Sequence, residues 1–168
     1  ESQALDRIER ELKDALSVRP TLVVWLFDQS SAAGTTRRTL ITAAAQMHAR
    51  LADQTPSKSR GSKDSGKSNA PRHKLLTAVT AFGREVKVLT PEPVDDAGRL
   101  PAVESVIEED GASRLAYTAV HTAAERFAAF RKRGHEVIIV LVAHAAEADE
   151  AKFKSAVTTL KSAAIPVF

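Results

Sequence analysis

The sequence predicts an α/β fold: a doubly wound, mostly parallel sheet with helices on both faces and one antiparallel hairpin at its edge. Two short apolar runs, at residues 22–27 and 137–142, have the composition of strands buried on both faces. Segments with helical spacing alternate with the strand-like segments, as in α/β proteins. Gly83 and Arg84 separate two further strand-like segments by a tight turn, which indicates the hairpin.

The first third of the chain reads as helix, strand, helix. Apolar residues recur at helical spacing between residues 5 and 16, and Pro20 ends that segment. The strand at 22–27 follows and closes with a polar Asp-Gln-Ser-Ser cluster. Residues 37–51 form the next predicted helix, whose apolar stripe consists of Leu40, Ala44, Met47 and Leu51.

The remaining elements follow in the same alternation. Residues 75–83 and 85–90 are predicted strands of the hairpin, and a short helix at 100–107 precedes an acidic loop at 108–112. A long amphipathic helix at 115–130 ends with Lys132, Arg133 and Gly134, as last-turn cations and a C-terminal glycine should. After the strand at 137–142, a helix at 148–163 and the start of a strand at 165–168 complete the pattern.

Length and composition favour one domain over residues 1–168, since 168 residues with 43% hydrophobic content can bury one core. The absence of cysteine excludes disulfides, thiol catalysis and thiolate zinc sites, but assigns no compartment. No apolar run approaches the roughly 20 residues of a membrane helix. Glu1 in place of Met indicates a piece of a larger protein, whose signal or anchor would lie outside this sequence.

The net charge of +3 comes from one segment, because residues 57–74 carry +5 and the remainder carries −2. Residues 55–73 are rich in Ser, Lys, Gly and Pro, and are predicted to form a basic surface loop without fixed structure. This loop has no aromatic residue on which a base could stack. We therefore expect no specific nucleic-acid partner.

A phosphate-loop pattern, GxxxxGK[ST], is present at residues 61–68. A working phosphate loop follows a buried strand and opens a helix, whereas this copy follows polar residues and runs into Asn69-Ala70-Pro71. Composition alone explains such a match in a segment rich in Ser, Gly and Lys. A nucleotide-binding α/β domain remains an alternative function.

The order of these segments resembles a von Willebrand factor type A (vWA) domain, and most of all its bacterial branch. The stretches that carry the resemblance are TLVVWLFDQS, LLTAVTAFG, VKVLTPEPVDD, EEDGAS, YTAVHTAAERF, VIIVLV and IPVF. The resemblance covers nearly the whole chain outside residues 55–73. It implies a Rossmann-like fold and a noncatalytic, adhesion-type protein-binding module, not an enzyme, within an extracytoplasmic or membrane-tethered bacterial protein.

In the resembled family, Asp-x-Ser-x-Ser, a later Thr and a later Asp together hold Mg²⁺, which a partner's carboxylate completes. The matching metal-ligand candidates here are Asp28, Ser30 and Ser113, whereas Ala32 and Ala143 replace oxygen ligands. We therefore predict a largely lost metal site and no resident cofactor, with weak Mg²⁺ binding at most. A magnesium-dependent domain is the first alternative, and His144 as a ligand for a softer metal such as Zn²⁺ is another.

Ligands bind at the carboxyl ends of strands in open α/β sheets, so a protein partner is expected at that edge. The predicted partner-binding residues are Asp28, Gln29, Ser30, Ser31, Asp110, Ser113 and His144. A simpler interpretation is that Asp28 and Ser30 cap the following segment and satisfy local backbone donors. Glu147, Asp149 and Glu150 are interpreted as acids near the first turn of a helix, where they complement its dipole.

Overall fold

The computed structural model describes residues 2–53, 73–96, 99–107, 115–144 and 149–168. The predicted basic loop at 55–73 lies outside the described residues except for His73, and the phosphate-loop pattern lies wholly outside them. Asp110 and Ser113 lie outside them as well.

The described strands form one sheet of four, in the order β3-β2-β1-β4. Their bounds are Thr21–Asp28 for β1, Leu75–Phe82 for β2, Val86–Val88 for β3 and Glu136–Val142 for β4. β1 is parallel to both β2 and β4, and β3 is antiparallel to β2. The predicted fold class, including the edge hairpin, is confirmed, although β3 is shorter than residues 85–90.

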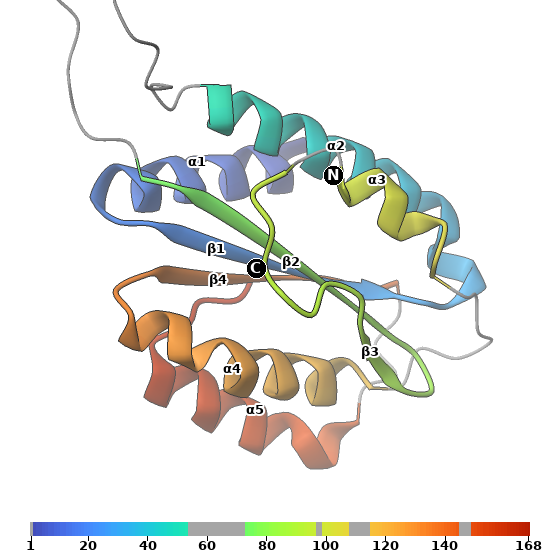
Figure 1. Ribbon diagram of the computed structural model, residues 1–168. Coiled ribbons are helices and arrows are strands. Elements are labelled where there is room, and N and C mark those ends of the chain that lie inside the picture. The colour runs from blue at the N-terminus through green and yellow to red at the C-terminus, as the bar shows by residue number, and fades with distance from the viewer. Residues whose placement is uncertain (1, 54–72, 97–98, 108–114, 145–148) are drawn as a thin grey trace, which may run out of the picture.

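Helices cover both faces of the sheet, as predicted (Figure 1). α1 (Ser2–Val18), α2 (Gly34–Asp53) and the short α3 (Arg99–Glu104) lie on one face. α4 (Ala116–Lys132) and α5 (Glu150–Ala163) lie on the other. No helix among the described residues is long and apolar enough to span a membrane.

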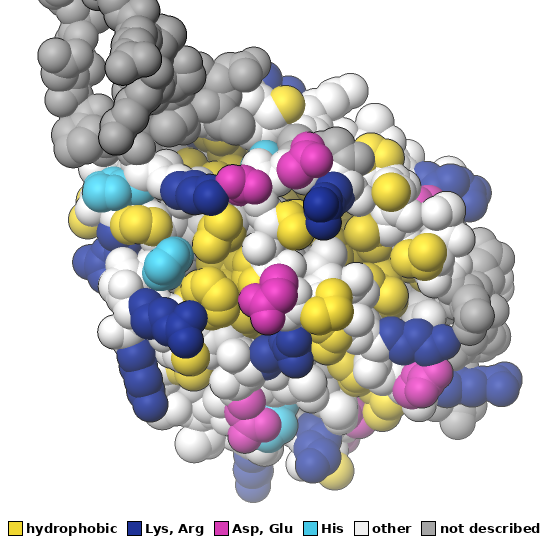
Figure 2. Space-filling view, in the orientation of Figure 1, with side chains coloured by type: hydrophobic (Ala, Val, Ile, Leu, Met, Phe, Trp, Pro, Cys, Tyr) yellow, Lys and Arg dark blue, Asp and Glu magenta, His cyan; other side chains and the backbone are white. Residues whose placement is uncertain are grey.

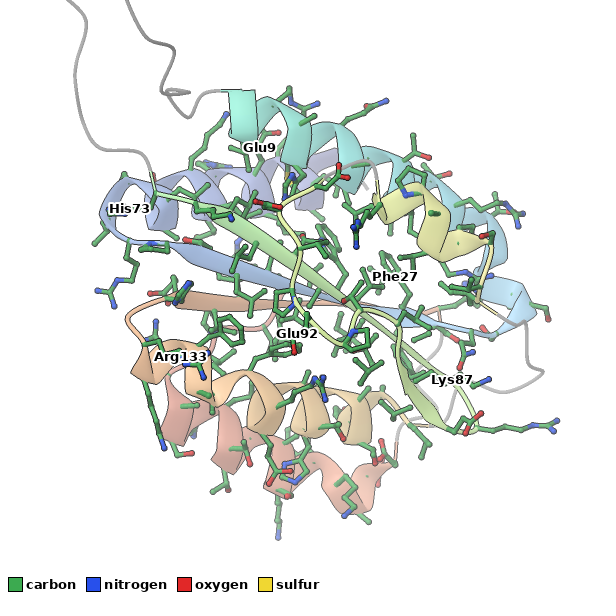
Figure 3. All side chains as sticks on the ribbon, in the orientation of Figure 1. Glu9, Phe27, His73, Lys87, Glu92 and Arg133 are labelled. Carbon is green, nitrogen blue, oxygen red and sulfur yellow. The ribbon has the colours of Figure 1, made fainter. Side chains whose placement is uncertain are left out.

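β1 is the centre of the core because side chains on its two faces enter two separate clusters. Val23, Trp25 and Phe27 join the cluster under α1 and α2, and the rings of Trp25 and Phe27 stack with centroids 6.0 Å apart. Leu22, Val24 and Leu26 join the cluster under α4. Phe27 lies between the sheet and the α2 and α3 layer (Figure 3). Every residue of β1 is buried, and each large apolar side chain contributes about 1.5–3 kcal/mol to stability.

The ends of β1 and β4 meet at the carboxyl edge of the sheet. Phe27 pairs with Val142, so Asp28 and Ala143 emerge side by side. The two apolar runs at 22–27 and 137–142, which were predicted to be buried strands, are therefore neighbouring parallel strands. The predicted strand at 165–168 appears as one parallel bridge, between Val167 and Ile139.

Candidate functional site at the carboxyl edge

Asp28 is the last residue of β1, and its carboxylate is fully buried. One carboxylate oxygen, Oδ1, accepts the backbone N–H of Ser30 at 2.7 Å. The other, Oδ2, accepts the backbone N–H of His144 at 3.1 Å. The carboxylate therefore fixes the turn that follows β1 and joins it to the end of β4.

The turn after Asp28 is also tied to β2, because the backbone N–H of Gln29 donates to the carbonyl of Phe82 at 2.8 Å. The side chains of Gln29 and Ser30 are buried, and Ser30 makes no side-chain capping bond to the 3₁₀ turn Ser31–Ala33 that follows. Ser31 and His144 are exposed. Among the described candidates, these two side chains are accessible to a partner, and the other three lie beneath them.

Arg37 is a buried residue of this edge that the sequence analysis missed. Its side chain is 1% exposed, and its Nη1 donates to the carbonyl of Asp28 at 2.7 Å and to that of Ser30 at 3.4 Å. Its Nε lies 3.2 Å from Oε2 of Glu104 on α3. A signal was present in the sequence, because Arg37 falls on the same helical stripe as Leu40, Ala44, Met47 and Leu51, where a charged residue must find buried partners.

Asp149, at the start of α5, makes hydrogen bonds that the sequence did not predict. Its carboxylate makes no capping bond to its own helix, α5. It accepts instead the backbone N–H groups of Tyr117 at 2.8 Å and Thr118 at 3.0 Å, together with the Thr118 hydroxyl. Asp149 therefore caps α4, because the tertiary fold brings the starts of the two helices together.

An aromatic pair stands beside this cap. The rings of Tyr117 and Phe153 meet edge to face with centroids 5.1 Å apart, and Phe153 is 49% exposed. Both rings line a shallow pocket of about 510 Å³ with Glu150, Ala151 and Lys154. A larger apolar cavity of about 660 Å³ lies between α1 and the end of β4, lined in part by Trp25 and Phe168.

His48 on α2 is 2% exposed, and neither of its ring nitrogens has a hydrogen-bond partner among the described residues. Burial lowers the pKa of His48 from its ordinary value, while the carboxylates of Asp95 and Asp96 act in the opposite direction. The folded protein therefore favours the neutral imidazole.

Metal ligands are sparse in the described parts of the chain. They contain no group of three or more His, Cys, Asp or Glu side chains that could hold a metal ion. At the carboxyl edge, the two carboxylate oxygens of Asp28 each accept a backbone N–H. Ala32 and Ala143 are exposed and bring no oxygen from their side chains.

No protein-family model matches the chain, and no curated protein matches it in sequence. Solved structures do match its fold. One is the proximal thread matrix protein 1 from the mussel byssus, at 15% identity and a TM-score of 0.52 over 89% of this chain. The chain spans 37% of that structure's length.

Two further structures have similar folds. The N-terminal domain of TFIIH p34 matches 90% of this chain and 80% of its own length, at 15% identity and a TM-score of 0.51. The SpRpn10 VWA domain matches 88% of this chain and 86% of its own length, at 8% identity and a TM-score of 0.42. At 15% identity, the matches to the thread matrix protein and to TFIIH p34 support the α/β fold and leave function to be argued from the site.

Proposed function

We propose that this chain is a noncatalytic protein-interaction module of vWA type, which binds a protein partner at the carboxyl edge of its sheet without a resident metal. The observation that carries the proposal is the pair of hydrogen bonds that Asp28 accepts from the N–H groups of Ser30 and His144. These two bonds show that Asp28, the only acid in the Asp-Gln-Ser-Ser motif, fixes the backbone at the carboxyl edge.

The oxygen donors at this edge do not fit the Mg²⁺ site of the resembled family. Magnesium requires near-ideal octahedral geometry and carboxylate ligands. Ala32 and Ala143 supply no side-chain oxygen, and the buried guanidinium of Arg37 lies under the same turn and opposes a second cation. Ser113 keeps its status as a proposed ligand, since it lies outside the described residues.

The accessible surface at this edge suits a protein partner. Tyr117 and Phe153 form an aromatic pair at the starts of α4 and α5, where Phe153 is 49% exposed, and aromatic residues are enriched at protein interfaces. Figure 2 shows basic and acidic side chains interspersed over the described part of the face in view, which is not the pattern of a nucleic-acid-binding surface. Both features favour a protein partner.

One cluster with catalytic residue types is better explained by packing. His121 of α4 lies 3.1 Å from the hydroxyl of Thr159 on α5, and 3.5 Å from the carboxylate of Glu125. All three residues lie in helix interiors, where backbone N–H groups are used by the helix and cannot stabilise an oxyanion. We interpret the cluster as a polar contact between α4 and α5.

A magnesium titration followed by thermal unfolding tests the absence of a metal. A ligand that binds only the folded state must raise the melting temperature. We expect the same melting temperature in excess chelator and at millimolar Mg²⁺. A rise with Mg²⁺ would establish the magnesium-dependent alternative.

The location of the interface is tested by charge insertion. Ser31→Arg with Ala143→Arg alters two exposed positions of the carboxyl edge, and Ser17→Arg with Val18→Arg makes the matched change near the start of β1. Chemical crosslinking in an extract of the source cells should yield adducts with the wild type and the control, with and without chelator. The edge variant should lose these adducts. Adducts that persist in the edge variant, or that are lost equally from the control variant, would contradict an interface at the carboxyl edge.

A further inference from the structure

The guanidinium of Arg37 is a buried cation at the centre of the carboxyl edge. It bonds two backbone carbonyls of the turn, those of Asp28 and Ser30, through one nitrogen. Through another nitrogen it bonds Glu104, the last residue of α3, whose side chain is 22% exposed. Burying a cation is costly unless partners of this kind surround it, so these contacts form a unit that loses stability if any member is removed.

We propose that Arg37 is the positioning residue of the binding edge: its guanidinium orders the turn that a partner meets and joins that turn to α3, in place of a bound metal ion. This inference rests on the proposed function for the identity of the edge. Ser31 presents no charge to solvent. Arg37 therefore contributes the fixed backbone shape of the turn, and not a charge on its surface.

The contacts require arginine in particular. Nη1 and Nε of one guanidinium point in different directions in a fixed plane, and they reach the turn and Glu104 at the same time. A lysine ammonium is a single point donor and cannot hold both partners in this geometry. Arg37→Lys therefore keeps the positive charge and removes the connection between the turn and α3.

Amide hydrogen exchange measures the order of the turn directly, without a partner. The N–H groups to follow are those of Ser30 and His144, which are bound by Asp28, and the N–H of Val79 in β2 as an internal reference. In Arg37→Lys and Glu104→Gln we expect exchange at Ser30 and His144 to be faster by at least about tenfold, with Val79 unchanged. Arg50→Ala is the matched control, because Arg50 lies on the same helix, is exposed and pairs with Glu9.

Chemical rescue separates this role from a general loss of stability. Arg37→Ala leaves space for a small cation of the missing shape, so millimolar methylguanidinium chloride should restore the slow exchange of Ser30 and His144, whereas equal concentrations of NaCl or MgCl₂ should not. Methylguanidinium should have no such effect on Arg50→Ala. If Arg37→Ala does not fold, the comparison of Glu104→Gln with Arg50→Ala still decides the matter.

Two results would overturn the inference: wild-type exchange rates in both Arg37→Lys and Glu104→Gln, or rescue of Arg37→Ala by MgCl₂ as effectively as by methylguanidinium. Neither result depends on the proposed function, which fails separately if Mg²⁺ stabilises the wild type or if the edge variant keeps its crosslinked partners.

Discussion

Oδ2 of Asp28 lies 3.1 Å from the backbone nitrogen of His144, so the acid at the end of β1 holds the end of β4 across 116 positions of sequence. The carboxylate is fully buried, and its bond to Ser30 is buried as well, so that bond is protected from competition by water, whereas the bond to His144 is partly buried. The first prediction follows from this arrangement.

Asp28→Ala should destabilise the fold by roughly 3 kcal/mol, because two hydrogen bonds to a charged acceptor disappear and the buried N–H of Ser30 loses its acceptor. Urea unfolding measures the change. Asp14→Ala is the control, since Asp14 is exposed on α1, and it should change stability by less than about 0.5 kcal/mol. A loss below that size for Asp28→Ala would contradict the structural role given to this carboxylate.

Stability should fall as the pH drops below about 6.5, because the unfolded state takes up a proton on His48 more readily than the folded state does. Burial lowers the pKa of His48 in the folded protein, so its contribution is fully present above the unfolded pKa and is lost on acidification. His48→Leu should reduce this pH dependence and raise stability at pH 7 by about 1 kcal/mol, since it removes a buried imidazole that has no hydrogen-bond partner among the described residues.

The control for His48 is His144→Gln, because His144 is exposed and its backbone, not its ring, contacts Asp28. Thermal unfolding between pH 5 and pH 8 should show the wild-type slope in His144→Gln and a flatter slope in His48→Leu. Equal slopes in the wild type and His48→Leu would remove His48 as the source.

Asp149→Ala should destabilise the protein by about 2 kcal/mol, the upper end for the loss of a helix cap, since three donors at the start of α4 lose one carboxylate. Glu150→Ala is the neighbouring control, and it should have an effect of less than about 0.5 kcal/mol because Glu150 is exposed. Denaturant unfolding compares the two. Similar losses in both variants would mean that charge at the start of α5, and not the cap on α4, is what matters.

Restoring oxygen to the edge should create a magnesium response. Ala32→Ser with Ala143→Asp places a second carboxylate beside Asp28, so their repulsion should destabilise the metal-free protein. Mg²⁺ at ten times its dissociation constant should then return about 1.4 kcal/mol. The response must vanish when Asp28→Ala is added, and thermal unfolding that shows the same response in that triple variant would separate these residues into different sites.

The sequence was sufficient for the fold because β1 and β4 contain continuous apolar runs, and the long helices have apolar residues at helical spacing. It was also sufficient to place Asp28 and Ala143 at one edge, since parallel neighbours end together. Element lengths at the edge were less predictable: β3 and the bridge at Val167 depend on pairing with β2 and β4, which local composition does not encode.

The side-chain contacts of the site could not be predicted from sequence patterns, because they join residues that are far apart in the chain. Arg37 to Glu104 and Asp149 to Thr118 join residues 67 and 31 positions apart. Sequence patterns assign the carboxylate of Asp149 to α5, the helix that it precedes, because they consider only residues close to it in the chain. The fold instead offers it the unsatisfied N–H groups of another helix, and that contact satisfies more donors.

The cap that Asp149 places on α4 has a consequence for the making of the protein. Tyr117 leaves the ribosome 32 residues before the carboxylate that will hold its N–H group. Until then the N–H groups in the first turn of α4 must bond to water or to another acceptor. β4 lies between the two helices in sequence, so it emerges before the cap on α4 can form. The cap on α4 can therefore form only after β4 and the start of α5 have been synthesised, because it requires Asp149.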